Sequence, residues 1–185
     1  LASAGMYQSK TFLDAEAGNN RMQGVVVGAG SHGYDQVISL NIVHGRYFSP
    51  SESAAGRPVA VIGHEVANQL FGRSEVVGQT LKVRGIRMEV IGVLAQEGES
   101  IVSTGLDEFM LVPSAFAPRI YDARADDNAQ IAIKAQPGVD LAALEDELVQ
   151  QLRAVRRVRP GREEDFSVNR MEMLTSILDS IFANL

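Results

Sequence analysis

Residues 59–72 have the sequence VAVIGHEVANQLFG, and this stretch decides the fold class. Four apolar residues are followed by a glycine and then by eight residues whose apolar side chains recur at helical spacing. The short β-branched run predicts a buried strand, and the following spacing predicts a helix that Gly72 ends. The stretch therefore predicts a strand, a tight turn and a helix packed back onto a sheet.

The sequence before this unit predicts a β-hairpin. Two runs, within residues 6–15 and 22–27, are rich in apolar and β-branched side chains, and Gly18-Asn19-Asn20 lies between them as turn material. A further short apolar run covers residues 37–43. After it, residues 49–53 predict a loop and a helix cap.

The sequence after this unit predicts more strands and one long loop. Residues 80–83 and 88–94 form an expected hairpin around Gly85, and residues 109–112 an expected strand that Pro113 ends. Residues 95–107 between them are polar and contain glycine. We expect them to form a loop of the length that carries function.

The last third of the chain predicts a strand, a helix and a second strand. Residues 130–135 and 166–168 are the expected strands, and Asp140 is expected to cap the helix between them. A final apolar stripe at helical spacing reaches the last residue, so we expect the natural polypeptide to continue. These elements together indicate an α+β fold with mixed sheets and split βαβ units, rather than a doubly wound sheet.

Composition excludes several classes of protein. The chain has 185 residues, 45% of them hydrophobic, which suffices for one domain or two small lobes. It has no cysteine, so thiolate catalysis, disulfides and cysteine metal sites are excluded, and its net charge of −6 disfavours nucleic acid as a partner. No run approaches the roughly 20 apolar residues of a membrane span.

The motifs associated with catalysis are incomplete. Residues 28–33, GAGSHG, have the GxGxxG spacing of dinucleotide sites, but no second strand with an acidic end follows at the required distance. We therefore favour a plain glycine-rich loop and keep a nucleotide-dependent enzyme using Gly28 to Gly33 as an alternative. His64-Glu65 begins like a zincin helix, but Asn68 stands where the second histidine ligand belongs. We expect no enzyme activity, cofactor or metal.

A set of short motifs, taken in order, resembles a known family. They are GRYF at 45–48, VAVIG at 59–63, VA at 66–67 with LFG at 70–72, VGQ at 77–79, VIGV at 90–93 and VP at 112–113. Their order and spacing resemble the periplasmic core domain of MacB-like and FtsX-like ABC transporter permeases.

The residues that carry this resemblance are scaffold residues. The glycines occupy positions where turns or close backbone contacts exclude a side chain, and the aromatic residues supply core. Arg46 is expected to be a buried or lobe-bridging hydrogen-bond donor. The set comprises Gly45, Arg46, Phe48, Gly63, Phe71, Gly72, Gly78, Gly92 and Pro113.

The resemblance implies a two-lobed domain between the first and second membrane helices of a permease. A porter-like lobe would comprise residues 1–45 and 114–185, and an inserted sabre-like lobe residues 46–113. The implied partners are a cytoplasmic ABC ATPase subunit or domain, a periplasmic adaptor protein and a second permease in a homodimer or heterodimer. The domain would lie outside the cytoplasmic membrane, in the periplasm or extracellular space. A lipoprotein-releasing permease of the same superfamily is the alternative.

The long loop and the start of the helix at His64 are the predicted partner-binding surface. Exposed long loops on a rigid scaffold usually carry recognition. The candidate partner-binding residues are Glu97, Glu99, Ser100 and Asp107. Paired carboxylates of this kind could serve as acid and base, but acidic loop residues are more often simply solvated.

Overall fold

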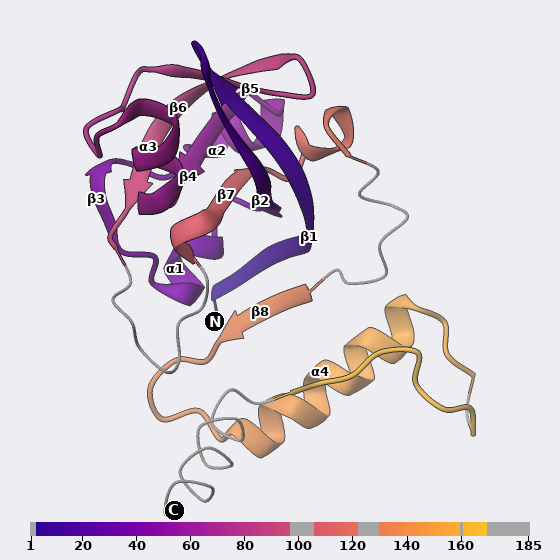
Figure 1. Cartoon of the computed structure of the whole chain (residues 1–185). Coiled ribbons are helices and arrows are strands. Elements are labelled where there is room, and N and C mark those ends of the chain that lie inside the picture. Colours follow the sequence, from indigo (N-terminus) through magenta and orange to yellow (C-terminus); the bar gives the residue numbers. More distant parts are fainter. Residues whose placement is uncertain (1–2, 97–105, 122–129, 160, 170–185) are drawn as a thin grey trace, which may run out of the picture. The chain divides into compact units, whose positions relative to one another are not determined.

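The computed structural model describes residues 3–96, 106–121, 130–159 and 161–169. The chain divides into two compact units, residues 1–134 and residues 135–185 (Figure 1). Each unit is described separately below.

The first unit is built around eight strands and short helices. The strands are β1 (Ser3–Ala17), β2 (Asn20–Gly30), β3 (Ile42–Gly45), β4 (Val59–Ile62), β5 (Thr80–Val83), β6 (Ile86–Leu94), β7 (Phe109–Pro113) and β8 (Gln130–Lys134). The helices are α1 (Tyr34–Ile38), α2 (Pro50–Ala55), α3 (His64–Phe71) and the 3₁₀ turns η1 (Leu106–Glu108) and η2 (Ala117–Arg119).

Six of these strands close into a ring, in the order β2-β7-β4-β6-β5-β1 with β1 pairing β2 again (Figure 1). Two pairs, β2–β7 and β4–β6, are parallel, and the others are antiparallel. The β1–β5 contact that completes the ring pairs Ala15 with Val83 and Glu16 with Lys82. β3 adds to β6, and β8 adds to the first part of β1. The result is a small mixed barrel.

Alternation along the strands fills the main core. Val25 and Val27 of β2, like Leu81 and Val83 of β5, are fully buried, while Lys82 between the latter two is exposed. Helix α3 adds Val66, Ala67 and Leu70 to the same cluster, together with Phe116, Ala117 and Ile120 from around η2. A second cluster, around Tyr47, Phe48, Ile91 and Leu111, covers other faces of the strands.

Helix ends follow local sequence signals. Ser49 caps α2: its side chain accepts a hydrogen bond from the Glu52 amide, and the Glu52 carboxylate accepts one from the Ser49 amide, 2.9 Å away. Proline at the first turn fits this geometry. Helix α3 ends at Gly72, whose left-handed φ of 70° allows its amide to reach the Asn68 carbonyl.

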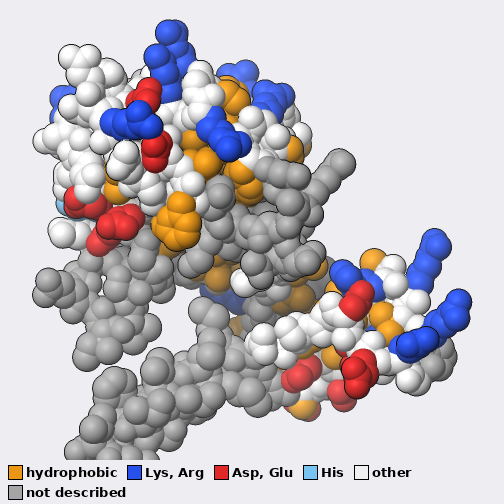
Figure 2. Space-filling view, turned by 45° about the vertical axis from the view of Figure 1, so that its right-hand side comes forward, with side chains coloured by type: hydrophobic (Ala, Val, Ile, Leu, Met, Phe, Trp, Pro, Cys, Tyr) orange, Lys and Arg blue, Asp and Glu red, His pale blue; other side chains and the backbone are white. Residues whose placement is uncertain are grey.

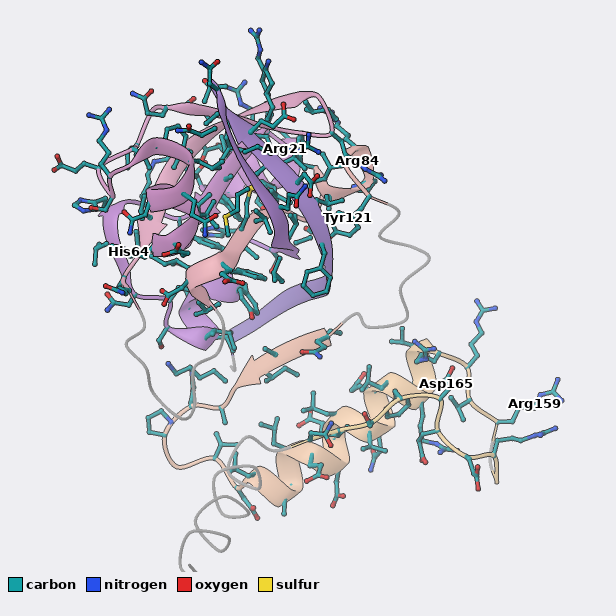
Figure 3. All side chains as sticks on the ribbon, in the orientation of Figure 1. Arg21, His64, Arg84, Tyr121, Arg159 and Asp165 are labelled. Atoms are coloured by element: carbon teal, nitrogen blue, oxygen red, sulfur yellow. The ribbon has the colours of Figure 1, made fainter. Side chains whose placement is uncertain are left out.

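The second unit contains helix α4 (Leu141–Val155) and the return segment 161–169. Asp140 caps α4 by accepting a hydrogen bond from the Ala142 amide at 2.9 Å. Two ion pairs tie the return segment to the end of α4: Arg156 binds Asp165 at 2.8 and 2.7 Å, and Arg153 binds Glu164. Figure 3 shows Asp165 and Arg159 at this end of the unit.

Most of the predicted elements are confirmed. The hairpin around Gly18 and Asn19, the strand–turn–helix unit, the hairpin at Gly85, the strand ending at Pro113 and the capped helix after Asp140 all form. The apolar run 37–43 is divided, because α1 ends at Ile38 and β3 begins at Ile42. The mixed sheet of the expected α+β fold is present.

One predicted strand is wrong. Residues 166–168 form no strand, so the expected βαβ unit of residues 130–168 lacks its second strand. The pattern that predicted this strand is only three residues long. The two residues immediately before it, Glu164 and Asp165, form ion pairs with Arg153 and Arg156 at the end of α4. The final helix expected from the apolar stripe that reaches the last residue lies outside the described residues.

The boundaries expected after residues 45 and 113 stay a prediction. The β1–β5 and β2–β7 pairings join segments on both sides of them. Among the residues that the structure describes, none of the helices has the length and apolarity that crossing a membrane requires.

Candidate partner-binding surface

Helix α3 presents a polar face above a buried one. Its apolar face is fully packed, whereas Gln69 is exposed and His64, Glu65 and Asn68 are half-buried. Gln69 donates a hydrogen bond to Glu65 at 2.9 Å, one turn earlier. The face that α3 shows to solvent is therefore ordered and polar, which suits recognition of a protein surface.

Gly63 brings the turn η1 against the start of α3. The Gly63 amide donates to the Phe109 carbonyl at 2.7 Å. A Cβ at Gly63 would overlap the backbone carbonyl oxygens of Leu106 and Asp107. The structure thus joins the end of the predicted loop to the start of the predicted helix, because only glycine permits this backbone contact.

The structure places one of the four candidate partner-binding residues. Asp107 lies half-buried in η1, beside the exposed Glu108. Glu97, Glu99 and Ser100 lie outside the described residues. Among the described residues, no group of three histidine and carboxylate side chains could hold a metal ion.

The scaffold residues predicted around Gly45 and Gly92 form a tight backbone junction. The Arg46 amide donates to the Ile91 carbonyl at 2.9 Å, and a Cβ at Gly92 would lie 2.6 Å from the Arg46 carbonyl oxygen. Gly45 has a φ of 78°, and a Cβ there would overlap the Ile91 carbonyl oxygen. The chain leaves β3 through this junction toward Tyr47 and the core.

The expectation of a buried Arg46 is wrong, and the lobe-bridging alternative stays a prediction. Its side chain is 57% exposed and forms a bidentate pair with Glu52 at 2.7 and 2.8 Å, plus a bond to the Tyr47 carbonyl at 3.0 Å. Both partners lie within six residues along the chain. Hydrogen bonding to Arg46 lowers the pKa of Glu52 to about 2, against an ordinary value of 4.5.

The remaining scaffold residues have distinct positions. Phe48 is buried in the second cluster, and Phe71 packs partly buried against the main core. The Gly78 amide donates to the Val90 carbonyl at 2.8 Å. Pro113 ends β7 opposite Gly30 and is buried.

The glycine-rich stretch 28–33 packs a tyrosine. Gly28 and Gly30 lie within β2, and the helix that follows has only five residues. Tyr47 donates from its hydroxyl to the Ser31 carbonyl at 3.1 Å, and a Cβ at Gly30 would lie 2.6 Å from that hydroxyl. Burial raises the pKa of the Tyr47 phenol. The space that a phosphate would need beside Gly30 is occupied by this side chain.

Sequence reasoning missed a groove on the outer face of β1 and β5. It is lined by Phe12, Leu13, Asp14, Glu16, Arg21, Lys82, Arg84 and Gly85, with a volume of about 370 Å³. The alternation of basic with buried apolar residues along β5 and the turn after it could have indicated it. Figure 3 shows Arg21 and Arg84 on the same side of the unit.

The sequence model of the MacB-like periplasmic core domain matches residues 2–151. The chain belongs to this family. The matched span covers the barrel and most of α4. It is accordingly a periplasmic or extracellular domain of a MacB-like ABC transporter permease.

Curated relatives of this MacB-like domain are export proteins. The chain is 33% identical over 115 residues to a pyoverdine export ATP-binding/permease protein, PvdT, of Pseudomonas entomophila, covering 61% of the chain and 18% of that protein. It is 30% identical over 149 residues to a macrolide export ATP-binding/permease protein, MacB, of Bdellovibrio bacteriovorus, covering 80% and 22%. The chain thus spans about a fifth of the length of these relatives.

Two solved structures share the fold. The periplasmic region of MacB from Actinobacillus actinomycetemcomitans superposes with a TM-score of 0.74 at 14% identity, covering 95% of this chain and 75% of that one. The extracellular domain of the noncanonic ABC-type transporter YknZ from Gram-positive bacteria superposes with a TM-score of 0.64 at 20% identity. The superposition covers 84% of this chain and 76% of that one. At such identities the likeness concerns the fold.

Proposed function

We propose that this MacB-like domain is a non-catalytic module that couples ATP hydrolysis in the cytoplasm to the handling of a substrate or partner outside the membrane. The observation that carries the proposal is the family match over residues 2–151. The curated relatives that cover most of the chain are named as ATP-binding/permease export proteins. Export is therefore the process in which we place it.

The barrel has the rigidity that such coupling needs. Its interior is filled by fully buried side chains at close packing, and six of its strands close into a ring. Backbone contacts at Gly63 and Gly92 leave no space for side chains between elements. A packed body of this kind moves as a whole when force is applied to one end.

The proposed partners are those of a transporter complex. They are a cytoplasmic ABC ATPase subunit or domain, reached through the membrane part of the permease, a second permease copy and a periplasmic adaptor protein. The polar face of α3, together with η1 and the loop that ends there, is our proposed adaptor-binding surface. Its support is the Gly63 contact, which fixes Leu106 and Asp107 beside the helix.

Charge reversal in the full-length permease tests this surface. The variant Glu97→Lys/Glu99→Lys/Asp107→Lys should reduce both co-purification of the adaptor and export, because three negative charges of the proposed surface become positive. Glu147→Lys, an exposed carboxylate on α4, is the control and should leave both unchanged. Normal assembly and normal export in the triple variant would refute the surface.

Cofactor titration of the purified chain separates this proposal from an enzyme. We expect no saturable binding of NAD or FAD, since Tyr47 occupies the space beside Gly30. Saturable binding that Gly30→Val abolishes would contradict the non-catalytic role.

A further inference from the structure

The groove on the outer face of β1 and β5 has the size of a small-molecule site. Its volume of about 370 Å³ falls within the range of ligand pockets, roughly 300–1,000 Å³. Figure 2 shows lysine and arginine side chains on the upper part of the larger unit, with hydrophobic and acidic side chains among them. This mixture differs from the acidic character of the whole chain, whose net charge is −6.

Strand register places several cations side by side. Glu16 of β1 faces Arg21 on one side and Lys82 on the other, and Lys82 faces Arg87 of β6. Lys82 and Arg87 are thus like charges directly opposite each other, an arrangement that costs stability in a sheet. An anion bound beside them would relieve this repulsion.

The acids of the groove are largely engaged by one of its cations. Arg21 binds Asp14 at 2.6 Å and lies 3.7 Å from Glu16. Asp14 also accepts a hydrogen bond from the Gly24 amide at 3.3 Å, and the bond to Arg21 lowers its pKa, which keeps it ionised. The side chains that line the groove include three cations, Arg21, Lys82 and Arg84, and two carboxylates, Asp14 and Glu16. The excess is positive.

Arg84 is held at the groove by an unusual backbone conformation. It has a φ of 50° and precedes Gly85 at 79°, in the turn between β5 and β6. Such turns favour glycine, asparagine or aspartate at positive φ, so arginine is unfavourable there. Its side chain donates to the Ile120 carbonyl at 3.1 Å, which fixes the guanidinium near the groove.

An exposed aromatic side chain completes the site. Phe12 is 70% exposed and lines the same groove as Lys82 and Arg84. An exposed phenylalanine beside these cations offers both an apolar surface and charge. We propose that this groove binds an amphiphilic anion, a discrete molecule with one anionic group and an aromatic or aliphatic body.

The concave shape favours a discrete molecule over a membrane surface. The anionic group would lie between Lys82 and Arg87, and its apolar body against Phe12. The inference stands apart from the proposed transport role, since loss of this binding would leave the family membership and the adaptor surface unaffected.

Fluorescence titration of the 185-residue chain with anilinonaphthalene sulfonate, an aromatic anion, tests the site. We expect saturable binding that Lys82→Gln/Arg87→Gln weakens by about fivefold or more, the size of exposed charge contacts. Phe12→Ser should weaken it as well. Raising salt from about 0.05 to about 0.5 M should also weaken it, because salt screens exposed charges.

Matched controls make the result decisive. Arg57→Gln/Arg73→Gln removes two exposed cations outside the groove and should leave the affinity unchanged. Phenylnaphthylamine, an uncharged analogue, should bind weakly. Equal binding of both probes, or full affinity in Lys82→Gln/Arg87→Gln with an unchanged circular dichroism spectrum, would overturn the proposal. Binding to phosphatidylglycerol vesicles without binding of the soluble probe would overturn it in favour of a membrane surface.

Discussion

Gly30 can be interpreted from the sequence either as part of a nucleotide site or as a packing residue. Its place in a GxGxxG spacing indicates a nucleotide site, whereas its contact with the Tyr47 hydroxyl makes it a packing residue. The sequence could not distinguish the two, because Tyr47 lies 17 positions later and no periodicity connects the residues. Only the folded chain brings them together.

Gly30→Ala should destabilise the chain by about 1–3 kcal/mol, because the new methyl group meets the Tyr47 hydroxyl. Tyr47→Phe removes that oxygen, so the cost of Gly30→Ala should fall in the Tyr47→Phe background. Urea unfolding of the four proteins measures this coupling. Additive effects would show that the contact is not the cause.

The Arg46–Glu52 pair predicts a pH-dependent stability. The folded pKa of Glu52, about 2, lies below its ordinary value of 4.5, so the contribution is present above pH 4.5 and is lost as the pH falls toward 2. Glu52→Gln should cost about 0.5–1 kcal/mol at pH 7, as exposed pairs do. The difference in the free energy of unfolding between Glu52→Gln and the original chain should become smaller as the pH falls from 5 to 2.5.

Arg46→Gln provides the parallel for this pair. This substitution removes the same ion pair by changing its other partner. The difference in the free energy of unfolding from the original chain, measured by urea unfolding at each pH, should therefore become smaller over the same pH range. A gap that stays constant over this range in both variants would show that the pair contributes nothing through ionisation.

At the scale of elements, sequence patterns predicted most helices and strands. The strand–turn–helix unit and the capped α4 carry strong local signals, namely a β-branched run, helical spacing and capping residues. The strand predicted at residues 166–168 was wrong because a three-residue pattern is a weak signal. The ion pairs of Arg153 and Arg156 with the preceding residues could not be predicted from that pattern. Of the candidate site, Asp107 lies beside the start of α3 and its partner-binding role stays a prediction, while the groove of Phe12 was not foreseen.

The junction of α3 with η1 makes a prediction about two glycines. Gly63→Ala should destabilise by about 1–3 kcal/mol, since the backbone of Leu106 and Asp107 must move. Gly72→Ala meets no atom within 4 Å and incurs only the strain of a positive φ, about 1 kcal/mol. Thermal and urea unfolding of the two variants measure these losses of stability. A larger loss from Gly72→Ala would contradict the importance of this junction.

At the scale of the molecule, the closed ring of strands could not be predicted from the sequence. Each hairpin was visible locally, but the β1–β5 and β2–β7 pairings join residues far apart in the chain. The family resemblance supplied the class of protein where periodicity could not. The ring and its packed interior, both in the first unit, are the features on which the proposed transmission of movement rests.

Spin-label distances in the full-length permease complex test this coupling most directly. In a full-length permease whose other cysteines are replaced, a single cysteine at Gln69, on the exposed face of α3, can carry one label in each of two permease copies. We predict that the distance distribution between the labels shifts from the nucleotide-free to the vanadate-trapped state, and that a hydrolysis-deficient ATPase abolishes the cycling between them. An identical distribution in both states, in a complex that still hydrolyses ATP and exports, would contradict the account.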